Sequence, residues 1–122
     1  MAAFNIAFEP PETGTGSYSL KGRPVDLVHL ARQTMGDKEL ETEVLMLFAR
    51  QARQCLDRLA NEPAENRPAI AHQIKGAARG IGATAVADAA EALESAPTDA
   101  APLARLAQAV TEAENFICGL LR

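Results

Sequence analysis

The chain has no tryptophan, one tyrosine and four phenylalanines, so large aromatic side chains are scarce. Alanine is abundant instead, and a sequence rich in alanine and poor in aromatic residues favours closely packed helices over sheets. A length of 122 residues is sufficient for one domain with a modest core. The composition therefore predicts an all-α fold.

The chain also lacks the features of several functional classes. Its formal net charge is −4, which disfavours a nucleic-acid-binding protein, because such proteins usually carry a basic stripe. No apolar run approaches the roughly 18–20 residues of a membrane span, and the N-terminus lacks the basic flank and long apolar core of a signal peptide. The two cysteines, Cys55 and Cys118, have no paired spacing, so we interpret them as reduced core residues. A cytoplasmic protein that does not bind membranes is expected.

Residues 1–24 differ from the rest of the chain. Phe4, Ile6 and Phe8 alternate with smaller residues, and a segment rich in proline and glycine follows them. We interpret residues 1–24 as a flexible arm. The alternative is an arm whose phenylalanines dock on the domain or on a second copy of it.

Residues 25–122 are expected to form the domain. Asp26 can cap a short helix that Gly36 ends, and Asp37 can cap a long second helix. The apolar positions of the second helix are Leu40, Val44, Leu47, Phe48, Ala52, Cys55, Leu56 and Leu59. A third helix spans roughly 67–82, a fourth 84–96 with Val86, Ala89, Ala90 and Leu93 inward, and the last carries Leu103, Leu106, Val110, Ala113, Ile117 and Leu120. Short connections predict a monomeric, antiparallel up-down four-helix bundle with an additional short N-terminal helix.

The third helix carries the most informative sequence, RPAIAHQIKGAARGIGAT over residues 67–84. At about 100° per residue, the positions i, i+3, i+4 and i+7 share one face, which here holds His72, Lys75, Gly76 and Arg79. The opposite face holds Ile70, Ile74, Ala77 and Ile81. A glycine inside a helix costs about 0.5–1 kcal/mol relative to alanine. Gly82 can end the helix, whereas Gly76 is explained if another molecule must approach His72 closely.

The run His72-Gln73-Ile74-Lys75-Gly76, followed by Ile81-Gly82-Ala83, resembles the signature of histidine-containing phosphotransfer (HPt) domains. One mild departure is Ala77, where a serine is common. The resemblance covers roughly residues 25–122. It implies that His72 is a phosphoacceptor that relays a phosphoryl group between aspartyl phosphates on receiver domains. A neutral imidazole is a good nucleophile near pH 7.

The same resemblance gives roles to the neighbours of His72. Lys75 would assist transfer by its charge, and Gly76 would leave room for the partner. Partners would be response-regulator receiver domains, a hybrid histidine kinase, or both. No cofactor is expected on this chain, because Mg²⁺ would sit on the receiver. Arg79 and Ala83, on the histidine's side, are candidate partner contacts, and the family pattern does not fix Arg79.

Other catalytic interpretations find little support in the sequence. There is no glycine-rich ATP-binding loop, and no His/Cys motif at zinc-ligand spacing. Glu91 and Glu94 form no evident acid pair and are interpreted as a solvated face.

Three alternatives stay open besides a free-standing relay protein: a phosphotransfer module of a larger chemotaxis-type histidine kinase, the dimerisation domain of a histidine kinase, and a non-catalytic helical adaptor. In such a dimerisation domain an acidic residue usually follows the histidine and a proline comes soon after, whereas Gln73 follows His72 and the next proline is Pro97. The Met1 start and the missing ATP-binding segment favour the relay protein, and His72 with Lys75 disfavours the adaptor.

Overall fold

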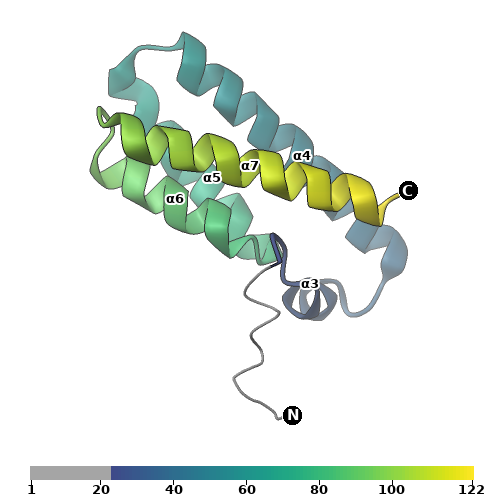
Figure 1. The fold of residues 1–122 in the computed structure, drawn as a ribbon. Helices are drawn as coiled ribbons and strands as arrows, with labels where there is room; N and C mark the ends of the chain where they lie inside the picture. Colours follow the sequence, from purple (N-terminus) through teal and green to yellow (C-terminus); the bar gives the residue numbers. More distant parts are fainter. Residues whose placement is uncertain (1–22) are drawn as a thin grey trace.

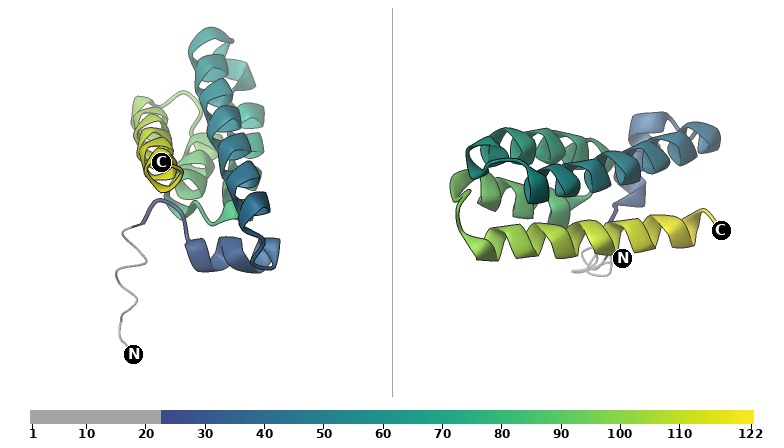
Figure 2. Two further views of the ribbon diagram at one scale, coloured as in Figure 1. Left: turned by 90° about the vertical axis from the view of Figure 1, so that its right-hand side faces the viewer. Right: turned by 90° about the horizontal axis from the view of Figure 1, so that it is seen from above.

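The computed structural model describes residues 23–122, and this part of the chain is all-helical (Figure 1). Four long helices run up and down, each antiparallel to the next (Figures 1 and 2). A short helix lies across one end of the bundle, where the first of the long helices begins. The helices are α3 (Leu27–Thr34), α4 (Lys38–Asn61), α5 (Arg67–Ile81), α6 (Thr84–Ser95) and α7 (Ala100–Leu120), with a single 3-10 turn, η1 (Ala64–Asn66), before α5. The predicted all-α bundle with an additional short helix is confirmed. The arm expected over residues 1–24 falls almost wholly outside the described residues.

Carboxylate caps begin the first two helices, as the sequence predicts. Asp26 accepts hydrogen bonds from the backbone N–H groups of Val28 and His29, and Asp37 accepts one from Leu40. Each cap satisfies donors that the first turn of a helix leaves free. The end of α3 differs slightly from the prediction. Met35 is already left-handed, with φ of 53°, so α3 ends at Thr34, two residues before Gly36.

The core lies between the four long helices and consists largely of small aliphatic residues. Ile70, Ile74 and Ile81 of α5 are buried, as predicted from the helical spacing. The inward face of α6 is also as predicted, with one further alanine, Ala87. Nine of the buried residues are alanines, namely Ala52, Ala71, Ala78, Ala83, Ala87, Ala89, Ala90, Ala109 and Ala113. Small residues let neighbouring helix axes approach closely, since the separation depends on the side chains at the contact.

Some core assignments on α4 and α7 were wrong. Leu40 and Leu47 are exposed, and Leu45 is buried in their place. The buried residues of α4 are Leu45, Phe48, Ala52, Cys55 and Leu59, which recur every three or four residues. Leu47 lies one residue, or about 100°, away from that stripe. On α7, Leu120 and Cys118 are exposed rather than buried. Cys55 is buried, which raises the pKa of its thiol.

The junction between α5 and α6 is fixed by Gly82, which ends α5 as predicted. Its φ of +79° is left-handed, a conformation that favours glycine. The start of α3 packs directly on this residue. A Cβ at Gly82 would lie 3.0 Å from Cβ of Asp26. The backbone N–H of Asp26 donates to the Gly82 carbonyl at 3.0 Å, and Nε2 of His29 donates to the Gly80 carbonyl at 3.2 Å. The short helix therefore secures the turn after α5.

Candidate functional site

His72 lies near the middle of α5, where it faces outward beside α6. Its side chain is 70% exposed. Its Nδ1 lies 2.9 Å from Oε2 of Glu94 on α6. An ionised carboxylate only accepts hydrogen bonds, so Nδ1 carries the proton and its N–H donates a hydrogen bond to Glu94. In the neutral imidazole the other nitrogen, Nε2, then holds a lone pair. No residue in the range 23–122 hydrogen-bonds to Nε2, so the nucleophilic nitrogen faces solvent.

Lys75 lies one turn beyond His72 and binds the same carboxylate. Its Nζ donates to Oε1 of Glu94 at 2.6 Å, and its side chain is only 15% exposed. The two oxygens of Glu94 therefore serve two different residues of α5. The hydrogen bond from Lys75, with a smaller contribution from His72, lowers the pKa of Glu94 against the opposing effect of desolvation. Glu94 is thus ionised near neutral pH, while the ammonium of Lys75 is engaged with it rather than free in solvent.

Arg79 continues the row of charged residues along α5. Its guanidinium donates to Oε1 of Glu91 at 3.1 Å, and both side chains are exposed. An exposed ion pair of this kind adds little to stability. The row along the α5–α6 interface thus pairs His72 and Lys75 with Glu94, and Arg79 with Glu91.

Gly76 is exposed on the outer surface of α5, beside His72. A Cβ built on Gly76 would meet nothing within 4 Å, and the same holds for Gly80 one turn further. Packing within the bundle therefore does not require glycine at position 76. Position 76 itself presents no side chain that would keep another molecule away from this part of α5.

The prediction for Ala83 was wrong. Ala83 is completely buried at the start of α6, so it offers no surface to a partner. Helical spacing placed it on the side of His72, but α5 ends at Ile81. The left-handed Gly82 turns the chain, and the 100° periodicity does not continue beyond it.

Glu94 is the site residue that the sequence interpretation missed, because it assigned Glu91 and Glu94 to a solvated face. A count from the turn would have found it. His72 lies eleven residues before Ala83 and Glu94 lies eleven residues after it. In an antiparallel helix pair, residues equally distant from the turn lie at the same height. The count therefore places Glu94 at the height of His72.

Residues 43–116 match the family model of the Hpt domain. The match covers more than half of the chain and includes His72, Lys75, Gly76 and Glu94. The chain belongs to the Hpt domain family. Hpt domains take part in phosphotransfer in two-component signalling, with response regulators and kinases as their general partners. A search of curated proteins and of solved structures found no match.

Two further observations concern the described part of this Hpt chain. Within residues 23–122, no helix is long and apolar enough to cross a membrane. Over the same range, no three side chains of histidine, cysteine, aspartate or glutamate gather closely enough to hold a metal ion.

Proposed function

We propose that this protein is a cytoplasmic phosphorelay intermediate, with His72 as its phosphoacceptor. It accepts a phosphoryl group from an aspartyl phosphate on one receiver domain and passes it to an aspartate on another. One observation carries the proposal: the exposed His72 imidazole donates Nδ1–H to Glu94, which leaves Nε2 as an outward-facing nucleophile. The chain needs no cofactor of its own for this reaction, since Mg²⁺ is expected on the receiver.

The transfer step follows from the tautomer of His72. The lone pair on Nε2 attacks phosphorus, and an N–P bond forms. The P–O bond to the aspartyl carboxyl breaks, and its electron pair leaves on that carboxylate. The proton on Nδ1 stays in place, so the ring becomes positively charged as the bond forms. Glu94 already accepts a hydrogen bond from that N–H and stabilises the developing charge. The reverse step delivers the phosphoryl group to the second receiver.

In this scheme Glu94 and Lys75 position the nucleophile and supply the charges around it. Glu94 fixes the tautomer and the orientation of the imidazole ring. Lys75 fixes Glu94 in turn and keeps it ionised. Its ammonium also lies one turn from the histidine, where its positive charge favours an incoming phosphoryl group. Lys75 therefore acts on the reaction in two ways, through Glu94 and through its own charge.

The partner's approach is supported by the shape of α5. Gly76 and Gly80 leave the helix backbone uncovered beside His72, so a receiver can bring its aspartyl phosphate close to Nε2. Arg79 borders this surface and is a candidate contact for an acidic group of the receiver. The protein acts as a monomer in this proposal.

The test is a phosphotransfer time course from a receiver domain that carries labelled aspartyl phosphate. Wild-type protein should acquire acid-labile label, and His72→Gln should acquire none while its thermal melt remains that of a folded domain. His29→Gln is the matched control, because His29 is the chain's other histidine and its imidazole hydrogen-bonds to the Gly80 carbonyl at the end of α5. If His72→Gln acquired label at the wild-type rate, His72 would be eliminated as the acceptor and the proposed relay function would be refuted.

A further inference from the structure

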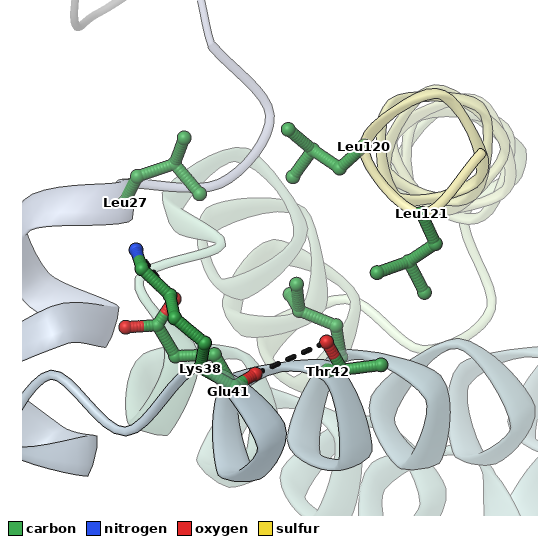
Figure 3. A pocket seen from close by; sticks show the side chains of 7 residues that line it. Leu27, Lys38, Glu41, Thr42, Leu120 and Leu121 are labelled. Atoms are coloured by element: carbon green, nitrogen blue, oxygen red, sulfur yellow. Dashed lines mark hydrogen bonds and ion pairs between the residues drawn. The ribbon is translucent and has the colours of Figure 1, made fainter.

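A cleft lies at the end of the bundle away from the site, between the start of α3, the first turns of α4 and the end of α7 (Figure 3). Its volume is about 250 Å³. Leucine side chains from three segments of the chain point into it, and polar residues of α4 form one edge. The lining residues are Leu27, Lys38, Glu41, Thr42, Leu45, Leu120 and Leu121.

The cleft is suited to an apolar occupant. Leu120 and Leu121 are 42% and 37% exposed, and Leu45, which also lines the cleft, belongs to the core. The polar edge already has hydrogen-bond partners within the domain. Glu41 accepts hydrogen bonds from Lys38 and from Thr34. Exposed apolar side chains gathered at a hollow mark a contact with another segment.

The chain itself supplies such a segment close by. Phe4, Ile6 and Phe8 alternate along the sequence, so in an extended conformation their side chains lie on one side. The described chain begins at Arg23, and Leu27, only four residues later, already lines the cleft. We propose that residues 4–8 dock in this cleft as an extended segment, with a phenylalanine ring inserted between the leucines of α3 and α7. The proposal is independent of the phosphotransfer chemistry.

The tether has ample length for this contact. Fourteen residues, 9–22, separate Phe8 from Arg23. The fifteen Cα–Cα steps between them span about 50 Å when extended and roughly 20 Å as a random coil. A tether of this length gives the attached segment an effective concentration on the order of 1 mM. A second copy of the protein has no such advantage, because association also costs translational and rotational freedom. The attached segment is therefore the favoured occupant.

Paramagnetic broadening tests the proposal in the full-length chain. A nitroxide is attached to Ala7→Cys in a Cys118→Ser background, because Ala7 alternates with the docking residues and leaves them unmodified. Amide signals of Thr42, Leu120 and Leu121 should lose most of their intensity. Signals from η1, near the opposite end of α4, should keep theirs. Reduction of the nitroxide should restore the lost signals.

Two variants test whether the broadening depends on the cleft. Leu120→Asp places a charge among the lining leucines and should abolish the broadening; the residue is exposed, so the domain should stay folded. Met46→Asp changes an exposed apolar residue of α4 that does not line the cleft, and should preserve the broadening. Equal intensities at the cleft and at η1 in the wild-type background would overturn the proposal. A second experiment mixes spin-labelled protein with isotope-labelled protein that lacks the nitroxide. Broadening that arises only between these molecules would also overturn the proposal, because the occupant would then be a second copy.

Discussion

Gly76→Ala should stabilise the protein, because the structure provides room for the added methyl group and no contact that opposes it. Gly76 is exposed, its φ is not left-handed, and a Cβ would meet nothing within 4 Å. The gain is then the helix-propensity difference alone, about 0.5–1 kcal/mol. For a domain of this size, that corresponds to a rise in Tm of about 2–8 °C.

The assay is urea denaturation, with thermal melts on the same preparations. The midpoint should rise while the m-value stays unchanged, since the surface exposed on unfolding is nearly the same. Gly82→Ala is the matched control on the same helix and should destabilise. Its φ of +79° is strained for alanine, and the methyl group would lie 3.0 Å from Cβ of Asp26. A loss of stability in Gly76→Ala would refute the reasoning, because it would reveal a packing role that the geometry excludes.

A longer side chain at the same position tests why glycine is there. Gly76→Gln should leave the fold intact, since the position is open. It should weaken docking of the receiver, seen as a higher receiver concentration needed for half-maximal transfer. Unchanged transfer by Gly76→Gln would show that the uncovered backbone is not needed for the partner's approach.

Three further outcomes are expected at the site. Glu94→Gln should slow transfer roughly five- to thirty-fold, because a neutral amide accepts a weaker hydrogen bond than a carboxylate does; a single-turnover time course measures this. Lys75→Ala should slow transfer roughly ten- to hundred-fold in the same assay, and Lys75→Arg less, since it keeps the charge. The lowered pKa of Glu94 means that its contribution to stability is present above its unfolded pKa of 4.5 and is lost as the pH falls through the lower folded value. Urea unfolding from about pH 6 to pH 3 should therefore show the difference between wild type and Glu94→Gln shrinking below pH 4.5.

Most of the fold follows from local sequence signals. Asp26 and Asp37 cap the first two helices through their own side chains, and Gly82 ends α5 through its own backbone, so no distant contact is needed to foresee them. The face of α4 was harder to predict, because residues 44–48 are all apolar and read VLMLF. Within such a run, periodicity does not determine which residues turn inward. In the packed bundle Leu45 and Phe48 are buried, whereas Leu47 is exposed.

The site divides in the same way between local and tertiary information. His72, Lys75 and Gly76 share one side of a single helix, so their spacing alone brings them together. Glu94 reaches them from another helix, and its role depends on the height at which α6 passes α5. Its sequence neighbours give no hint of that contact. The error at Ala83 has the same origin, since one left-handed residue redirects the chain and ends the periodicity.

The alanine content links the fold to the chemistry. Between them, α5 and α6 bury five alanines, Ala71, Ala78, Ala87, Ala89 and Ala90, and these two helices form the most extensive helix contact of the described chain. Small residues allow close helix approach, at the lower end of the usual 8–10 Å. A glutamate has only two methylenes between its backbone and its carboxylate, so Glu94 reaches both Nδ1 of His72 and Nζ of Lys75 only if the helices are close. The scarcity of large side chains in this sequence is thus a condition for the nucleophile's geometry. A bulky residue in place of a buried alanine at this interface would separate Glu94 from His72 even in a bundle that remained folded.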